Sequence, residues 1–144
     1  SRSRKNAQAA EYGLSMDGSA VFSFTITDVP RSINRFMSEF NIDKNDIDMY
    51  VFHQANLFIL KHLMKKLGLQ EEKVPVSIDR FGNTSGESIP LTLVDAIGGD
   101  ETGGTLKLFL CGFGVGLSWG GIYLEMDRSA CLPMIYTNDY YREF

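Results

Sequence analysis

Several short stretches of the chain alternate apolar and polar residues or are wholly apolar, and these predict strands. Residues 19–29 alternate apolar side chains with Ser and Thr, and 49–53 (MYVFH) form a strongly apolar run typical of a strand covered on both sides. Residues 74–78 (VPVSI) are a further candidate. Two closing strands, 105–113 and 117–126, flank a glycine-rich turn.

Apolar residues at helical spacing lie between these predicted strands. Pro30 stands where a helix can begin, and the apolar residues of 31–40 share one face. Asn56 is a candidate N-cap of a second helix, which Gly68 ends. A third helix is predicted from residue 88 or 90 to 97. The second helix has this apolar stripe: Leu57, Leu60, Leu63, Met64 and Leu67. Alternating strands and helices indicate an α/β layer architecture.

The two ends of the chain do not follow this pattern. Residues 1–15 are polar and predict a leader or linker, whereas 16–127 form the organised domain. Residues 128–144 form an aromatic-rich C-terminal tail. We expect this tail to cover a surface or join a partner rather than remain fully disordered.

Composition narrows the class of protein. The chain has 144 residues and a net charge of −4, so one domain is expected, with no global basic field to recruit nucleic acid or an anionic membrane. Its start lacks the apolar segment of a secretory signal, and no apolar run reaches membrane-spanning length. Two cysteines make neither a disulfide framework nor a zinc ligand set. We therefore expect a cytoplasmic protein.

Two polar residues and a glycine-rich turn are the candidate chemistry. His53 follows an apolar strand, where open α/β sheets place ligands, and Asn83 lies in a Gly-Asn-Thr-Ser-Gly turn. Backbone amides of residues 112–116 could approach a ligand closely. Together they could stabilise an oxyanion. Each also has a structural explanation: a satisfied histidine, a turn asparagine and a glycine hairpin or bulge.

Three ordered motifs add to this interpretation: HQANLFI, GNTSGESIP and GFGVGLSWGG. They resemble the patterns HQAN-x-R-I, GNTS-x-x-S-x-P and FGGG-x-TWG of the C-terminal half of the β-ketoacyl-acyl carrier protein synthase III family, in the thiolase superfamily. The resemblance runs from about Met16 to Met126. Type III polyketide synthases share the Cys–His–Asn logic but fit the first two motifs less well. The implied fold is α/β, one half of a thiolase-like fold with helices packed on a mixed β-sheet.

The resemblance implies an acyltransferase of fatty acid biosynthesis that performs a decarboxylative Claisen condensation. In such enzymes a cysteine takes an acyl group from acyl-CoA, and malonyl-acyl carrier protein then decarboxylates and attacks it. His53 and Asn83 match the two donors to the malonyl thioester oxygen. The backbone N–H of Val115 matches the oxyanion hole of the acyl-enzyme step. No cofactor and no metal are implied.

The family's nucleophilic cysteine lies in the N-terminal half, before the first residue of this chain. Cys111 falls in an apolar strand and Cys131 in the tail, so neither matches it. We therefore expect the chain to be inactive alone and to need an N-terminal half as partner. Since one half exposes the surface that meets the other, we also expect self-association, through that surface or through the aromatic tail. A homodimer is the expected assembly, although the exposed surface by itself specifies no stoichiometry.

A second departure affects the partner. The family's arginine in HQAN-x-R-I belongs to a basic surface that docks the carrier protein, and here it is Phe58. Lys65 and Lys66 match other basic positions of that surface, although they equally suit the solvated face of an amphipathic helix. Carrier docking is then weakened, shifted to another carrier or replaced by a CoA-linked partner. Two alternatives remain: a non-catalytic binding or assembly module, and part of an enzyme of specialised metabolite synthesis.

Overall fold

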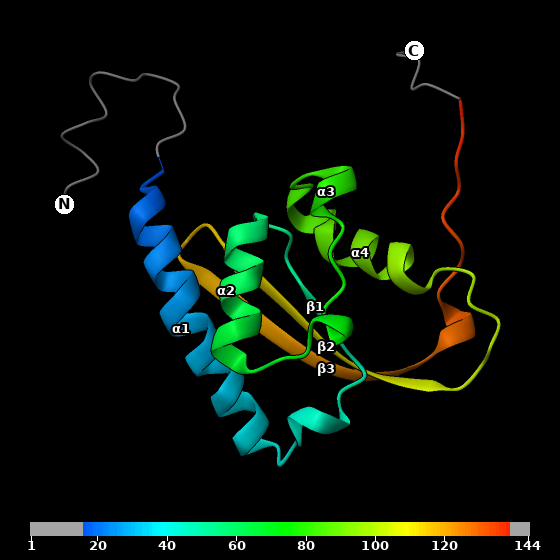
Figure 1. The fold of residues 1–144 in the computed structure, drawn as a ribbon, viewed down its shortest axis with the longest axis horizontal. Coiled ribbons are helices and arrows are strands. Elements are labelled where there is room, and N and C mark those ends of the chain that lie inside the picture. The colour runs from blue at the N-terminus through cyan, green and yellow to red at the C-terminus, as the bar shows by residue number, and fades with distance from the viewer. Residues whose placement is uncertain (1–15, 139–144) are drawn as a thin grey trace.

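A computed structural model describes residues 16–138, in which a three-stranded sheet lies between two layers of helices (Figure 1). The strands are β1 (Met49–Phe52), β2 (Thr105–Gly114) and β3 (Ser118–Asp127). Their order is β1-β2-β3, with β1 parallel to β2 and β2 antiparallel to β3. The α-helices of the described range are α1 (Gly18–Glu39), α2 (Leu57–Leu67), α3 (Ile78–Phe81) and α4 (Ser88–Ile97). Single 3-10 turns occur at Lys44–Asp46, Glu71–Lys73, Ser85–Glu87 and Arg128–Ala130. The expected α/β fold with a mixed sheet is confirmed.

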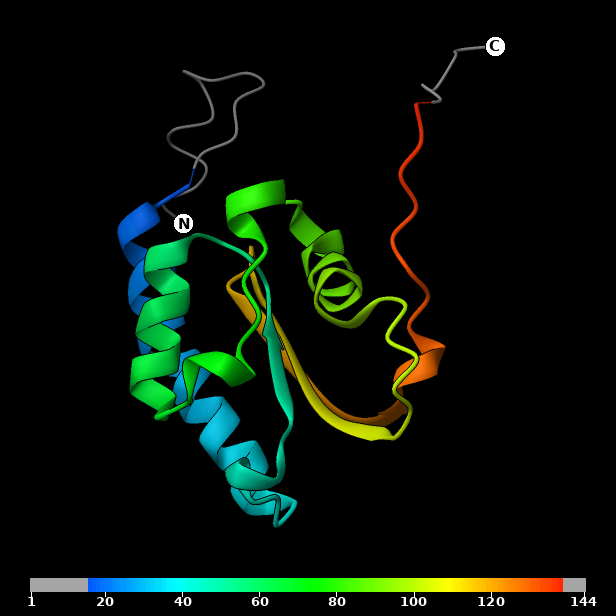
Figure 2. The same ribbon diagram turned by 45° about the vertical axis from the view of Figure 1, so that its right-hand side comes forward.

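The two helical layers pack on opposite faces of β2. Figure 2 shows α1 and α2 on one side of the sheet and α4 on the other. Every second side chain of β2 points toward α1 and α2 and belongs to the larger apolar core: Phe109, Cys111 and Phe113. Leu106 and Leu108 point toward α4 and form a second core with Ile97 and Cys131. A strand with period-2 side chains that are apolar on both faces is buried from both sides.

The predicted strand at 19–29 is wrong, because this segment is the first half of α1. Its buried residues Phe24, Val29, Ile33 and Met37 recur at spacings of four or five and continue past Pro30, which lies inside the helix. The Thr25 hydroxyl donates to the Val21 carbonyl (2.8 Å), so the polar residues of the alternating pattern are satisfied within the helix. Helical periodicity over the longer window therefore overrides the local alternation.

The predicted strand at 74–78 is also wrong: residues 74–77 pair with no strand, and Ile78 begins α3. The Gln54 amide lies between this segment and β1. Its Nε2 donates to the Phe52 carbonyl (2.9 Å), and its Oε1 accepts from the Ser77 N–H (3.1 Å). A side chain thus takes hydrogen bonds that a strand ladder would otherwise supply, and Pro75 has no N–H to contribute.

The ends of α2 agree with their predicted caps. The Asn56 side chain accepts from the Ile59 N–H (2.8 Å), and Gly68 adopts a left-handed conformation (φ 67°). Four residues of the predicted stripe are buried, whereas Leu57 is 43% exposed. The buried face of α2 therefore begins at Ile59, two residues later than the sequence indicates.

The C-terminal region after β3 first turns back onto the fold, where Cys131 is buried in the second core. Leu132, Ile135 and Tyr136 beyond it are exposed. The predicted leader, 1–15, and the end of the tail, 139–144, lie outside the described residues. The division into leader, domain and tail therefore stays a prediction.

Candidate active site

His53 is the first residue beyond β1 and lies at the carboxyl end of the parallel β1–β2 pair. Its N–H donates to the Cys111 carbonyl (2.9 Å), which extends the ladder by one residue. The half-buried ring places Nδ1 2.6 Å from Ser88 Oγ, and the ring packs edge-on against Phe113. Burial lowers the pKa of His53, and a hydrogen bond with the Ser85 backbone opposes part of this shift. The imidazole is thus held by contacts on two sides and favoured in its neutral form.

Asn83 lies in the loop between α3 and the 3-10 turn that leads into α4. Gly82 precedes it at φ 69° and ψ −163°, a backbone conformation open essentially to glycine. The Asn83 Oδ1 accepts from the Ser85 N–H (3.0 Å), and Nδ2 donates to the Ala55 carbonyl (3.4 Å). Since the oxygen is engaged by a backbone donor, the orientation of the amide is determined and its NH₂ group faces the His53–Ala55 segment.

The glycine-rich turn joins β2 to β3 at the same end of the sheet. Val115 is 93% exposed, and its carbonyl accepts from Ser118 Oγ (2.7 Å). Gly116 has φ +140°, and a side chain there would meet Ser118 at 3.0 Å. The strand that carries this turn also carries Phe113, which contacts His53. The three predicted elements therefore gather at one edge of the fold.

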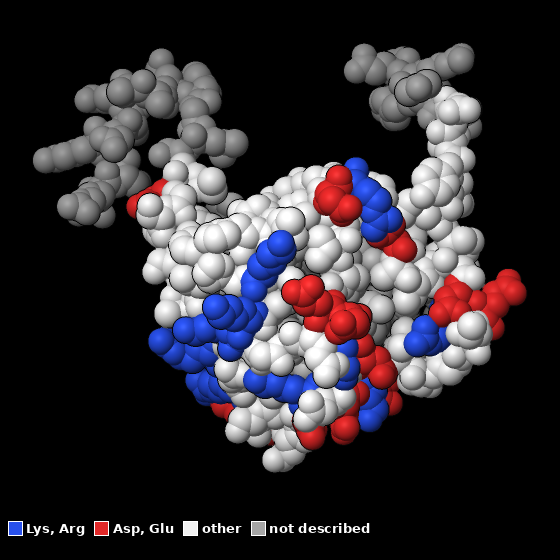
Figure 3. All heavy atoms as spheres, viewed as in Figure 1, with Lys and Arg blue, Asp and Glu red and all other residues white. Residues whose placement is uncertain are grey.

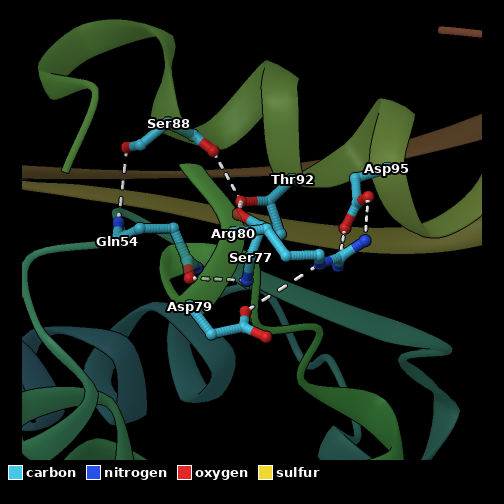
Figure 4. A network of polar contacts seen from close by, with 7 residues as sticks. All are labelled: Gln54, Ser77, Asp79, Arg80, Ser88, Thr92 and Asp95. Atoms are coloured by element: carbon cyan, nitrogen blue, oxygen red, sulfur yellow. Dashed lines mark hydrogen bonds and ion pairs between the residues drawn. The ribbon is translucent and has the colours of Figure 1, made fainter. Parts of the chain in front are cut away.

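A buried polar network that sequence reasoning missed includes Gln54, Ser77, Ser88 and Thr92 (Figure 4), and it contacts His53 through Ser88. Ser88 Oγ contacts His53 Nδ1 and accepts from the Gln54 N–H (3.3 Å), while the Ser88 carbonyl accepts from Thr92 Oγ1 (2.6 Å). Thr92 Oγ1 also meets Ser77 Oγ (2.6 Å), and Ser77 donates its N–H to Gln54. All four supporting residues are fully or almost fully buried. Gln54 lies in the motif HQANLFI and Ser88 in GNTSGESIP, and these positions were the sequence signal that could have revealed the network.

An ion pair next to this network ties α3 to α4. The Arg80 guanidinium forms two contacts with the Asp95 carboxylate and approaches Asp79 (Figure 4). Asp95 lies on the same helix as Ser88, one turn beyond Thr92. The pair therefore braces the α3–α4 connection that contains Asn83.

Neither cysteine is placed as a nucleophile. Burial raises the pKa of Cys111 to about 12, since its thiol is enclosed in the larger core. Burial also raises the pKa of Cys131, which belongs to the separate core beside α4. Within residues 16–138, no three His, Cys, Asp or Glu side chains gather in a way that could hold a metal ion. None of the helices in this described range is long and apolar enough to cross a membrane.

The exposed face of α2 is basic and begins with an aromatic cluster. Lys61, Lys65 and Lys66 are exposed and form no ion pair with any described residue, and Figure 3 shows basic side chains gathered over α1 and α2. Phe58 is 60% exposed and stacks on Phe22 of α1 at 5.4 Å between ring centroids. His62 packs against both rings. Phe58 is therefore part of an aromatic cluster that joins the two helices.

Residues 37–126, more than half of the chain, match the family described as 3-oxoacyl-[acyl-carrier-protein (ACP)] synthase III C terminal. A curated relative, the β-ketoacyl-[acyl-carrier-protein] synthase III of Streptococcus pyogenes serotype M49, is 42% identical over 115 residues, which cover 78% of this chain and 36% of that protein. This chain thus spans little more than a third of that relative.

Solved structures agree. A 3-oxoacyl-(acyl-carrier protein) synthase from Burkholderia xenovorans LB400 superposes with a TM-score of 0.82 at 40% identity, over 94% of this chain and 39% of that one. The priming β-ketosynthase from the R1128 polyketide biosynthetic pathway gives 0.69 at 32% identity, over 92% and 39%.

The mixed sheet between helical layers, with His53 at the end of a parallel strand, defines a thiolase-like α/β domain. The chain belongs to the β-ketoacyl-acyl carrier protein synthase III family and corresponds to its C-terminal region.

Proposed function

We propose that the chain supplies the histidine and asparagine of a condensing site that joins an acyl group from acyl-CoA to malonyl-acyl carrier protein in fatty acid biosynthesis. The observation that supports this most is that two neutral hydrogen-bond donors, His53 and Asn83, lie at the carboxyl end of β1. The neutral form of His53 is favoured by burial, and the NH₂ group of Asn83 is oriented by the Ser85 N–H. Both lie in a chain of the synthase III family.

The chemistry needs donors of this kind. When malonyl thioester loses CO₂, the electron pair of the broken C–C bond moves onto the thioester oxygen. Two N–H groups aimed at that oxygen, from His53 Nε2 and Asn83 Nδ2, stabilise the developing charge without changing their own charge. The enolate carbon then attacks the acyl-cysteine carbonyl, the backbone N–H of Val115 donates to the resulting oxyanion, and the cysteine sulfur leaves.

The nucleophile in this proposal is a cysteine outside these 144 residues, on an N-terminal half. Two features support an incomplete unit: the burial of both cysteines of the chain, and the outer edge of β3. Among the described residues β3 pairs only with β2, and Ile122 and Trp119 on it are 59% and 45% exposed. A long unpaired edge strand with exposed apolar residues is a surface that proteins normally cover. The N-terminal half covers it in our proposal, and the complete protein is a homodimer.

Carrier docking is proposed on the basic face of α2, through Lys65 and Lys66. The helix has no acidic residue, so its lysines present uncompensated positive charge in a chain of net charge −4. At the arginine position of the HQAN-x-R-I pattern, this chain presents the aromatic cluster of Phe58, so an apolar contact replaces a cationic one there. Changing Lys65 and Lys66 to Glu weakens binding of an acidic carrier, mainly at low salt, whereas changing both to Arg leaves binding within about twofold. Equal affinity of the two variants across a salt series contradicts this docking face.

A chimera tests the catalytic proposal. Residues 16–127 replace the matched region of the streptococcal synthase, and condensation of acetyl-CoA with malonyl-acyl carrier protein is measured. His53→Ala and Asn83→Ala each lower kcat by about 10²–10³, the usual effect of removing one oxyanion donor. Gln70→Ala, at an exposed side chain that makes no cap hydrogen bond and has no part in the proposal, is the control and leaves kcat within about threefold. A folded, active chimera that tolerates His53→Ala refutes the proposal.

A second candidate is an enzyme of specialised metabolite synthesis, favoured by the likeness to the priming β-ketosynthase of a polyketide pathway. The same chimera separates the two candidates, because a preference for the acyl carrier protein of a polyketide pathway over that of fatty acid synthesis favours the second. Carrier binding without condensation in a folded chimera instead supports a non-catalytic assembly module.

A further inference from the structure

Ser88 is the one polar side chain whose hydroxyl contacts the His53 ring among the described hydrogen bonds, and it has no role in the proposal above. It lies at the start of α4 with 1% of its surface exposed. Its Oγ is 2.6 Å from His53 Nδ1, 2.8 Å from the Ser85 carbonyl and 3.3 Å from the Gln54 N–H. A serine hydroxyl has one proton, so these contacts limit where the proton of the imidazole can be.

Two arrangements satisfy this count. In the first, Ser88 donates to the Ser85 carbonyl and accepts from a protonated Nδ1 of His53, which leaves Nε2 as a bare acceptor. In the second, Ser88 donates to Nδ1, and the proton of the neutral ring is on Nε2. The 2.6 Å contact with Nδ1 is shorter than the 2.8 Å contact with the carbonyl, and an imidazole nitrogen is the more basic acceptor. Ser85 is exposed, so water can satisfy its carbonyl in the second arrangement.

We propose that Ser88 is the positioning residue that selects the tautomer of His53, by donating its hydroxyl proton to Nδ1 and so keeping a proton on Nε2. This inference rests on the proposed function for its purpose: Nδ1 is engaged by Ser88, so Nε2 is the nitrogen left for a thioester oxygen, and it must carry a proton to donate. The Gln54 N–H donates to Ser88 Oγ and so helps to fix its rotamer, whereas Thr92 contacts only the backbone carbonyl of Ser88 (Figure 4).

The tautomer can be measured on this chain without turnover. The chain has two histidines, so the ¹⁵N resonances of both rings are resolved in a long-range ¹H–¹⁵N correlation spectrum, and His62 is an internal reference. At about pH 8, well above the ordinary histidine pKa of about 6.5, the ring is neutral and the two nitrogens differ clearly. We expect His53 Nδ1 to have the shift of an unprotonated nitrogen and Nε2 that of a protonated one.

Ser88→Ala removes this donor, and the Ser85 backbone, whose hydrogen bond with the ring raises the pKa of His53, is then the remaining hydrogen-bond partner of the ring. The His53 population then moves toward the Nδ1–H tautomer by about fivefold or more, the factor that one ordinary hydrogen bond gives in an equilibrium. Thr92→Val is the matched control. It removes a buried hydroxyl one turn away that does not contact His53, so the network is weakened but the tautomer is unchanged.

Two results overturn the inference: a wild-type His53 with its proton on Nδ1, or ¹⁵N shifts in Ser88→Ala that equal those of the wild type in a folded chain. The chimera separates this inference from the proposed function. If Ser88→Ala changes the tautomer but the chimera does not condense, the proposed function fails and the positioning role remains. If both hold, Ser88→Ala in the chimera lowers kcat by about tenfold or more and changes KM little.

Discussion

Gln54 offers a direct test of the buried network that holds the site together. Its side chain is fully buried and makes two hydrogen bonds, one to the Phe52 carbonyl (2.9 Å) and one from the Ser77 N–H (3.1 Å). Gln54→Met keeps the length and approximate volume of the side chain but removes the amide, so the Phe52 carbonyl and the Ser77 N–H both lose their partner. The variant therefore isolates the polar contribution from the packing contribution.

The magnitude follows from the two orphaned groups. Each buried polar group left without a partner costs about 1–3 kcal/mol, so the two together cost about 2–6 kcal/mol. Burying a thioether in place of an amide recovers about 1–2 kcal/mol. From the centres of the two ranges, about 4 and about 1.5 kcal/mol, the expected net loss in the free energy of unfolding is about 2.5 kcal/mol. With a urea m-value of about 2 kcal/mol/M, the midpoint of unfolding falls by about 1.2 M.

The assay is equilibrium urea unfolding followed by tryptophan fluorescence and circular dichroism. Gln70→Met is the matched control, because Gln70 is exposed and its side chain makes no cap hydrogen bond. That variant should stay within about 0.5 kcal/mol of the wild type. If Gln54→Met and Gln70→Met unfold at the same urea concentration, the Gln54 amide does not join β1 to residues 74–77 in the way described above.

Three further outcomes are expected. Gly82→Ala destabilises the chain by about 1 kcal/mol or more and broadens the NMR signals of the Asn83 side-chain amide. The space around Gly82 is open, but its φ of 69° and ψ of −163° strain any residue with a side chain. Gly18→Ala, at an unstrained position with open space, is the control and should be neutral or stabilising in the same urea assay. Burial lowers the pKa of His53 in the folded chain, so the unfolded chain binds more protons at this residue. The free energy of unfolding should therefore fall as the pH drops below about 6.5, the ordinary pKa of histidine. An NMR titration locates that pKa, and a pH slope that persists unchanged in His53→Gln assigns the effect to other groups. In Cys131→Ser, the remaining thiol of Cys111, whose pKa burial raises to about 12, should react with Ellman's reagent only as fast as the chain unfolds; rapid labelling of the folded variant contradicts the burial.

Local sequence was sufficient for the elements whose stabilising contacts are local. The second helix was predicted with both caps, because Asn56 and Gly68 act on the helix that they bound. β2 and β3 were predicted because alternating side chains flank a turn that only glycine-rich sequence allows. The motifs likewise located His53 and Asn83 and indicated the synthase III family, since a motif is a local property of the chain.

Tertiary structure decided the elements in which two local patterns compete. Residues 19–29 alternate as a strand does, but they form the first half of α1 because one helical stripe continues to Met37 and packs on α2 and the sheet. Residues 74–77 have a strand composition, yet a distant side chain, that of Gln54, takes the hydrogen bonds at that edge of β1. In both segments the contact that decides is remote in sequence, so local pattern could not reveal it.

The candidate site divides in the same way. By itself the sequence determined which donors the chain contains and the family to which they belong, because residue identity and spacing are enough for that. Only the fold decided that Ser88 meets His53, that the Asn83 amide reaches the Ala55 carbonyl, and that both cysteines are enclosed in apolar cores. Those facts depend on helices packing on both faces of the sheet, a long-range arrangement that the two apolar faces of β2 determine together.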